Sequence, residues 1–232
     1  MIKWVRIVTI IVALAFLGAG VFVLDAAIEL NLAYRAYKHR DMDQAMRHAR
    51  RANYSSRNDT KIIKSALKLE YTIAIKLGHP EKAMDYLGQA IQHDSSCGLC
   101  YLQRGDIEYK WKNYAAALDD FINGFENTGP LKPEVKAYYY ARQGLSHLEL
   151  GETEKAQEDS QNALQSDPES PLAFFLLSKV KAKLGDLEGA YGNASKAYRL
   201  GQKKTGFFSS PEGDLWLRYY GDTMIRYKSA QR

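Results

Sequence analysis

The feature that most constrains the fold is an alanine that recurs at nearly regular intervals through most of the chain. It occupies the same place in five similar segments, and the intervals are 38, 34, 39 and 34 residues. The five positions are Ala45, Ala83, Ala117, Ala156 and Ala190. A period of about 20–50 residues indicates an array of repeated units rather than one globular core. We attribute the two longer intervals to extra linker, at residues 54–61 and 128–134.

Each of the five segments has the pattern of two helices joined by a turn. The turns are Arg40-Asp41, Gly78-His79-Pro80, Lys112-Asn113, Gly151-Glu152 and Gly185-Asp186. Small or medium residues precede the turns, at Ala33, Tyr71, Gly105, Gly144 and Ser178. A second small residue follows each recurring alanine by seven positions, at Ala52, Ala90, Gly124, Ala163 and Ala197. Because helices that cross closely need small side chains at the crossing, this spacing predicts five helical hairpins.

This pattern resembles the tetratricopeptide repeat (TPR), over residues 26–204. The resemblance implies an all-α fold, an α-solenoid of about five TPR hairpins. The expected repeats are 26–59, 64–97, 98–131, 137–170 and 171–204. A single hairpin cannot bury its apolar face, so neighbouring hairpins must stack.

After the repeats, residues 205–232 are expected to form a C-terminal helix that caps the array. Ser209, Ser210 and Pro211 give it a helix-start pattern, and its aromatic side chains include Trp216 and Tyr219. A terminal repeat needs such a helix to shield its last apolar face. A helix that binds a partner or lies on a membrane surface is the alternative.

The amino terminus, residues 1–25, is expected to be a signal-anchor transmembrane segment. Residues 7–24 contain no charged side chain, and about 18 apolar residues nearly span a hydrocarbon core. Lys3 and Arg6 precede this run, while Asp25 and Glu29 follow it, which predicts a cytoplasmic amino terminus. A cleaved signal peptide and a buried helix are the alternatives. The predicted location is a bacterial inner membrane, crossed once, with the array in the periplasm.

Two cysteines, Cys97 and Cys100, form a C-x-x-C pair where the third repeat begins. Four interpretations remain open: a local disulfide, two inert thiols, a redox-active dithiol, or part of a metal site. An oxidising compartment would favour the disulfide. His93 adds at most one further local ligand, whereas structural zinc usually takes four.

Enzymatic motifs are absent from the sequence. It contains no phosphate-binding glycine loop, no G-x-S-x-G elbow and no H-E-x-x-H pattern. The net charge of +5 is spread over many segments, and no nucleic-acid motif accompanies it. We therefore expect no catalytic activity, no cofactor, no metal and no nucleic-acid partner.

The resemblance also implies a ligand groove formed by the first helix of each repeat. A lysine recurs at one position of that helix, with Glu149 replacing it in the fourth repeat. Lysines beside aromatic rings suit a protein or peptide partner of acidic character, and an ordinary solvated helix face is the alternative. The expected groove residues are Tyr34, Lys38, Thr72, Lys76, Asp106, Tyr109, Lys110, Tyr138, Phe175, Lys179 and Lys183.

Together these features predict a membrane-anchored scaffold that binds other proteins, in a bacterial cell envelope. Two alternatives differ from it. One is a protein whose activity depends on the Cys97–Cys100 pair, through thiol–disulfide exchange or a metal. The other is a fixed subunit of a secretion or surface-assembly machine.

Overall fold

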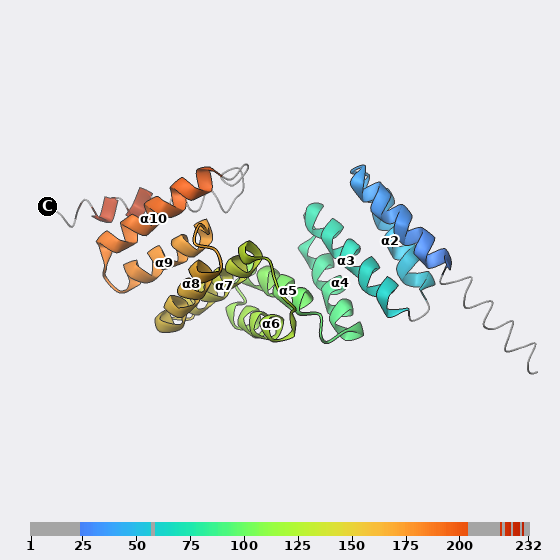
Figure 1. Ribbon diagram of the computed structural model, residues 1–232, viewed down its shortest axis with the longest axis horizontal. Helices are drawn as coiled ribbons and strands as arrows, with labels where there is room; N and C mark the ends of the chain where they lie inside the picture. The colour runs from blue at the N-terminus through green and yellow to red at the C-terminus, as the bar shows by residue number, and fades with distance from the viewer. Residues whose placement is uncertain are drawn as a thin grey trace, which may run out of the picture. The chain divides into compact units, whose positions relative to one another are not determined.

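The fold was analysed in a computed structural model, which describes residues 24–56, 59–203, 219, 221–223, 225–227 and 229. Regular secondary structure among these residues is helical (Figure 1). A helix over residues 24–38 comes first. It is followed by α2 (Met42–Ser55), α3 (Thr60–Lys76), α4 (Pro80–His93), α5 (Gly98–Lys110), α6 (Tyr114–Asn127), α7 (Pro133–Glu149), α8 (Thr153–Ser166), α9 (Pro171–Lys183) and α10 (Leu187–Gln202). Within the described residues these helices make five consecutive hairpins, as the sequence predicts.

All five hairpins turn in the same way. Three residues join the two helices, and the middle one has a left-handed backbone with φ between 63° and 85°. A backbone hydrogen bond closes each turn. In the second hairpin, for example, the His79 N–H donates to the Ala74 carbonyl at 2.9 Å. Glycine adopts this conformation without steric cost, and it occupies three of the turns. Arg40 and Lys112 adopt it in the other two, so the turn forms even where glycine is missing.

The chain forms two compact units, residues 1–101 and residues 102–232. In the first unit, α3 packs against α2 and α4. Its core includes Ala45, Leu69 and Ile73, which are fully or almost fully buried. In the second unit, α7 packs against α6, α8 and α9, and α9 packs against α10. Leu145 and Leu176 lie in the core of that unit.

The five recurring alanines confirm the predicted crossing positions, because each has no exposed surface. The glycines before the turns show why the position must stay small. A Cβ on Gly105 would lie 3.0 Å from the ring of Phe121, and one on Gly144 would lie 2.8 Å from the Cβ of Asp159. The hairpin helices therefore approach closely at the points that the sequence marks.

The prediction of extra linker in the two longer intervals is wrong. The connections there are short, residues 56–59 and 128–132. Most of the additional length lies instead in α3 and α7, which have 17 residues each, whereas α5 and α9 have 13. The Asp59 side chain caps the first turn of α3, and Pro133 stands at the start of α7, so each helix begins where a loop was expected.

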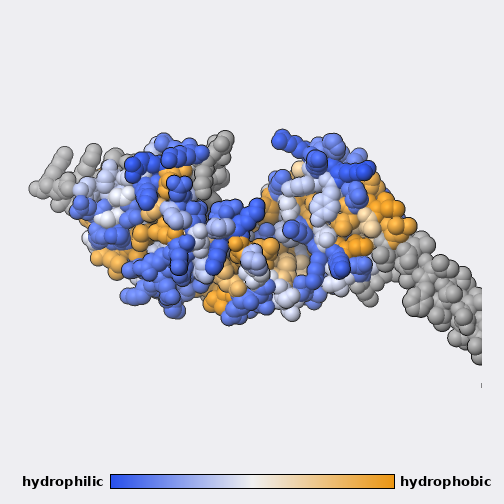
Figure 2. Space-filling view, viewed as in Figure 1, coloured by the Kyte–Doolittle hydropathy of each residue, from blue (hydrophilic) through white to orange (hydrophobic). Residues whose placement is uncertain are grey.

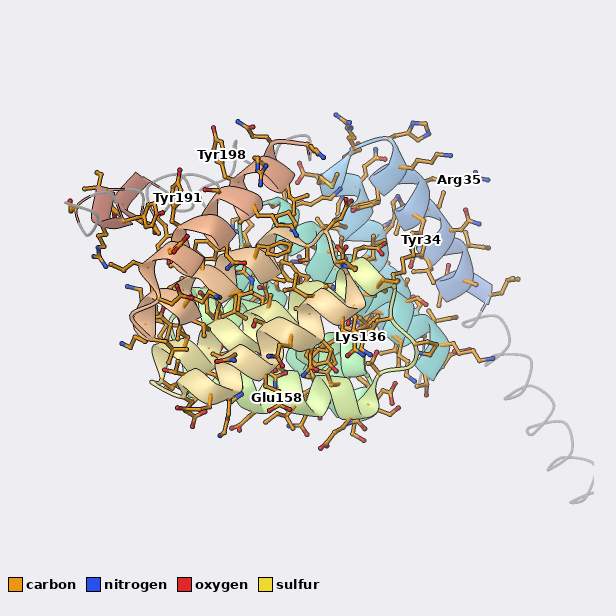
Figure 3. The ribbon with its side chains drawn as sticks, turned by 60° about the vertical axis from the view of Figure 1, so that its left-hand side comes forward. Tyr34, Arg35, Lys136, Glu158, Tyr191 and Tyr198 are labelled. Carbon is orange, nitrogen blue, oxygen red and sulfur yellow. A yellow bond between two sulfur atoms is a disulfide. The ribbon has the colours of Figure 1, made fainter. Side chains whose placement is uncertain are left out.

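Polar side chains cover most of the face of the molecule drawn in Figure 2. Lys136 on α7 and Glu158 on α8 are examples of exposed charged residues (Figure 3). Such a surface agrees with the interleaved charges of the sequence.

The two ends of the chain are described only in part. Among the residues that the structure covers, no helix is long and apolar enough to cross a bilayer, and residues 1–23 of the expected anchor lie outside them. Most of the expected cap, including Trp216, also lies outside. Its described residues are helical, and Tyr227 stacks on Tyr191 of α10 with ring centroids 4.9 Å apart.

A basic, aromatic pocket in the second unit

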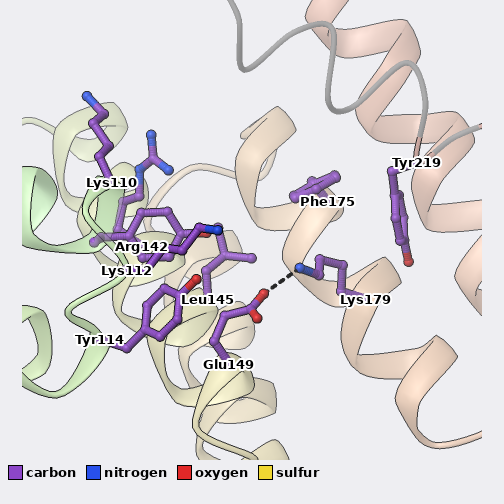
Figure 4. A pocket seen from close by; sticks show the side chains of 10 residues that line it. Lys110, Lys112, Tyr114, Arg142, Leu145, Glu149, Phe175, Lys179 and Tyr219 are labelled. Atoms are coloured by element: carbon purple, nitrogen blue, oxygen red, sulfur yellow. Dashed lines mark hydrogen bonds and ion pairs between the residues drawn. The ribbon is translucent and has the colours of Figure 1, made fainter.

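A pocket of about 420 Å³ opens on the second unit. Its walls combine aromatic rings with charged side chains, and Figure 4 shows how they surround the opening. The lining residues are Tyr109, Lys110, Lys112, Tyr114, Arg142, Leu145, Glu149, Phe175, Lys179 and Tyr219.

Helical periodicity explains why these residues meet. On α7, Arg142, Leu145 and Glu149 are spaced by three and four positions, which places them on one face. On α9, Phe175 and Lys179 are four positions apart and also share a face. The first helices of three successive hairpins thus contribute to one pocket, as a TPR-like groove requires.

Arg142 is the most deeply buried of the cations that line the pocket, with 4% of its surface exposed. Its Nε lies 2.9 Å from a carboxylate oxygen of Asp106, and it donates to the Tyr138 hydroxyl at 3.0 Å. That hydroxyl in turn donates to the same Asp106 oxygen at 2.8 Å. The guanidinium also lies over the rings of Tyr109 and Tyr138, 4.9 and 5.1 Å from their centroids. These contacts hold Arg142 in one orientation at the pocket wall.

The charges around the pocket favour a negatively charged ligand. Lys110 pairs with Asp106 at 2.9 Å, and Lys179 pairs with Glu149 at 2.8 Å (Figure 4). Lys112 forms no ion pair with any residue that the structure describes. Four cations, counting Arg142, therefore face two carboxylates, and the excess is positive.

The apolar part of the pocket is aromatic. The rings of Tyr109 and Tyr114 lie 5.6 Å apart, and the edge of one ring meets the face of the other in the Phe175–Tyr219 pair, at 5.1 Å. Burial, and then the charge of Glu149, raise the pKa of the Tyr114 hydroxyl above its usual value. Tyr114 is therefore a neutral hydrogen-bond donor near pH 7, beside rings that suit an apolar side chain.

A second pocket of about 290 Å³ shares Glu149, Lys179 and Tyr219 with the first. It adds Lys183 of α9 and Arg226 of the C-terminal helix. We call the two pockets together the unit 2 groove. The unit 2 groove follows α9 from Phe175 to Lys183 and carries an excess of cations, which suits an extended chain better than a small molecule.

The structure places the predicted groove residues of the second unit close to one another. Tyr109, Lys110, Phe175 and Lys179 line the main pocket, and Lys183 lines the second. Asp106 and Tyr138 lie behind them and hold Arg142. Five further residues line the main pocket without having been predicted from the sequence: Arg142, Lys112, Tyr114, Leu145 and Tyr219. The spacing of four between Tyr138 and Arg142 is the one sequence signal that could have indicated Arg142.

The four groove residues predicted in the first unit make local contacts. Lys76 lies 4.5 Å from the ring centroid of Tyr37, and the Thr72 hydroxyl donates to the Lys68 carbonyl at 2.7 Å. Tyr34 and Lys38 are exposed on the helix over residues 24–38. A binding role for these four residues stays a prediction.

A disulfide bond joins Cys97 and Cys100 at the start of α5. Cys100 is buried and Cys97 is half-buried, which favours a structural link over exchange with other thiols. Within the part of the chain that the structure describes, no group of three His, Cys, Asp or Glu side chains could hold a metal ion.

Stacked helical hairpins with a groove along their first helices define the class of repeat proteins that bind ligands on an extended surface. Residues 137–170 match the tetratricopeptide-repeat family, and this segment contains most of α7 and all of α8. One relative is the serine/threonine-protein kinase BSK1-2 of Oryza sativa subsp. japonica, 27% identical over 109 residues. The match covers 47% of this chain and 20% of that kinase, so the chain spans about a fifth of its length.

Solved structures show the same fold at low identity. MamA of Desulfovibrio magneticus RS-1 is 19% identical with a TM-score of 0.65, over 78% of this chain and 97% of that one. YrrB, described as a TPR protein with an unusual peptide-binding site, is 16% identical with a TM-score of 0.62, over 79% and 89%. Pseudomonas aeruginosa pilF is 16% identical with a TM-score of 0.60, over 89% and 90%. The fold is therefore an all-α, TPR-like array.

Proposed function

We propose that this protein is a membrane-anchored scaffold that binds an acidic peptide segment of a protein partner in the unit 2 groove. The observation that carries the proposal is the main pocket, where four cations and a set of aromatic rings face two carboxylates. An extended peptide with one or more Asp or Glu side chains would meet Lys112 and displace Glu149 from Lys179. A large apolar side chain of the same peptide would pack on Tyr114 and Phe175.

Panning a random-peptide display library against the full chain tests this function. We expect the enriched peptides to combine Asp or Glu with a large apolar residue. Replacing both Lys112 and Lys179 with glutamate should weaken their binding at least about tenfold in fluorescence anisotropy, because like charges then oppose each other in the groove. The matched control replaces Lys68 and Lys82, exposed lysines of the first unit, and should leave the affinity unchanged. Enrichment of basic peptides, or equal binding by both double variants, would contradict the proposal.

The cellular location is part of the same proposal. Residues 7–24 would cross a bacterial inner membrane once, with the array in the periplasm, as the charges of Lys3 and Arg6 favour. An oxidising periplasm also suits the bond between Cys97 and Cys100.

Topology mapping with a reporter fused to the carboxyl end checks the location. A reporter that is active only outside the cytoplasm should be active on the wild-type chain. It should be inactive when an arginine replaces each of Ile11 and Leu14, because two charges oppose membrane insertion of the segment. Activity of a cytoplasm-specific reporter on the wild-type chain would refute the periplasmic placement.

A further inference from the structure

A pocket of about 270 Å³ opens on the first unit and shares no lining residue with the unit 2 groove. Helix α2 contributes Arg47 and Arg50 to its lining. Lys82 of α4 and the turn residue His79, which precedes α4, complete the basic part. We call this cavity the unit 1 pocket. Three permanent cations, one lysine and two arginines, therefore come from two different helices to line it.

Helical spacing and packing bring these cations together. Arg47 and Arg50 are three positions apart on α2, so they lie one turn apart on the same face. Helices α2 and α4 both pack against α3. Arg50 reaches across to α4, where its Nη2 and Nε donate to the Tyr86 hydroxyl at 2.9 and 3.3 Å. The neutral hydroxyl orients the Arg50 guanidinium and leaves its charge in place.

The described part of the first unit does not neutralise these cations. Among the residues that the structure describes, Arg47 and Lys82 form no ion pair, and Asp43 is the one carboxylate in the lining. Glu70 is a buried carboxyl whose charge acts on Arg50. Burial raises the pKa of Glu70 to about 7, so it carries only part of a negative charge near neutral pH. The pocket therefore keeps an excess of positive charge, which attracts an anion.

The start of α4 adds to this attraction. The side chain of its N-cap residue, His79, makes no hydrogen bond to the first turn, and Pro80 has no N–H to offer. The positive end of the helix dipole therefore lacks a side-chain cap at the edge of the pocket. Met46 and Leu77 add apolar surface to the same lining. A ligand with a compact anionic group and a small organic part would use both kinds of surface.

We propose that the unit 1 pocket binds a phosphate monoester group. Such a group carries close to two negative charges near pH 7, which matches an excess of three cations over one carboxylate. The planar guanidinium groups of Arg47 and Arg50 suit its oxygens, and Lys82 adds a point charge. The bound phosphate would link α2 to α4 and so join the first two hairpins. This site is independent of the proposed function, because it lies wholly in the first unit.

Calorimetric titration of the full chain in a nonionic detergent with phenyl phosphate tests the proposal. We expect a Kd below about 1 mM. Replacing both Arg47 and Lys82 with glutamine should weaken binding at least about tenfold, because two charge-assisted hydrogen bonds are lost. The matched control replaces Arg35 and Lys68 with glutamine. These are also one arginine and one lysine, exposed in the first unit and outside the pocket lining, and their loss should leave the affinity unchanged.

Two further readouts address the kind of ligand and its place. Phenyl sulfate has a similar shape but a single charge, so it should bind at least about fivefold more weakly than phenyl phosphate. Asp43→Asn should strengthen phenyl phosphate binding about threefold, because a carboxylate that opposes the anion is removed. Hydrogen exchange should slow in α2 and in the first turn of α4 when phenyl phosphate is bound, and it should not change in α6.

The outcomes decide between a phosphate site and general attraction of anions. Equal affinity for phenyl phosphate and phenyl sulfate would overturn the assignment to phosphate. Equal weakening in the two double variants, or no binding at about 10 mM phenyl phosphate, would overturn the site. A free organic phosphate and a lipid headgroup share this chemistry. Stronger protection of α2 by phosphatidic acid in nanodiscs than by phenyl phosphate would support the site and assign the phosphate to lipid.

Discussion

Replacing Arg142 with leucine is expected to lower the free energy of unfolding of the second unit by about 3 kcal/mol. Arg142 is 4% exposed, and its removal leaves Asp106 and the Tyr138 hydroxyl without their shared donor. Breaking a buried ion pair by removing one partner typically costs about 3–5 kcal/mol. We expect the lower end of that range, because Lys110 still pairs with Asp106.

Urea unfolding of the full chain, followed by circular dichroism, measures this effect. The control is Arg199→Leu, which removes an exposed arginine of α10 in the same unit and should change stability by less than about 0.5 kcal/mol. Arg142→Lys keeps the charge but loses the planar group between the two rings, so it should recover only part of the loss. Equal unfolding midpoints for Arg142→Leu and Arg199→Leu would show that the network does not stabilise the unit.

The first unit should become less stable as the pH rises from about 5 to 8. Glu70 on α3 has no exposed surface, and its Oε1 has no hydrogen-bond partner among the described residues. Burial raises the pKa of this carboxyl from 4.5 to about 7, against smaller opposing effects of Arg50 and the Asn53 amide. Between those two values the folded chain holds a proton that the unfolded chain releases, so stability falls with rising pH. The loss should reach about 2–3 kcal/mol by pH 8.

Glu70→Gln should remove most of this dependence. The variant should match the wild type near pH 5 and exceed its stability at pH 8, since glutamine carries no charge to bury. Hydrogen exchange of α3 peptides, corrected for intrinsic rates, follows the first unit alone. The control is Asp159→Asn in the second unit, where burial raises the pKa of a second carboxyl to about 7. It should leave exchange in α3 unchanged. Equal protection of wild-type α3 at pH 5 and pH 8 would refute the expected shift.

The helical hairpins could be predicted from sequence because their signals are local. A small residue at a crossing, such as Ala117, and a glycine in a turn, such as Gly151, each reflect a backbone requirement of one hairpin. The length of α7 was mispredicted for the same reason. Residues 133–136 form the first turn of α7, and Val135 packs against a core cluster that includes Leu102 of α5 and Phe121 of α6, a contact that no pattern within one hairpin indicates.

The pocket could be predicted only in part. Tyr109, Lys110, Phe175 and Lys179 follow from their places on the first helices of the hairpins. Arg142 could not be predicted from the sequence, because its role depends on a contact with Asp106. Arg142 lies on α7 and Asp106 lies on α5, and the two residues meet only in the folded structure. Tyr219 joins the pocket from a segment outside the repeats, and no periodicity of the array indicates it. These two pocket residues are therefore identified by contacts between helices and not by the repeat pattern of the sequence.

The added length of α3 and α7 has a consequence for how such an array can grow. Four extra residues advance a helix by about 400°, so the faces beyond the insertion return to within about 40° of their original directions. Two extra residues would rotate them by about 200° and expose the buried side, including Leu145 on α7. Insertions in a first helix are therefore tolerated in steps of roughly one turn. The four residues by which α3 and α7 exceed α5 and α9 therefore keep the faces of these two helices nearly in phase.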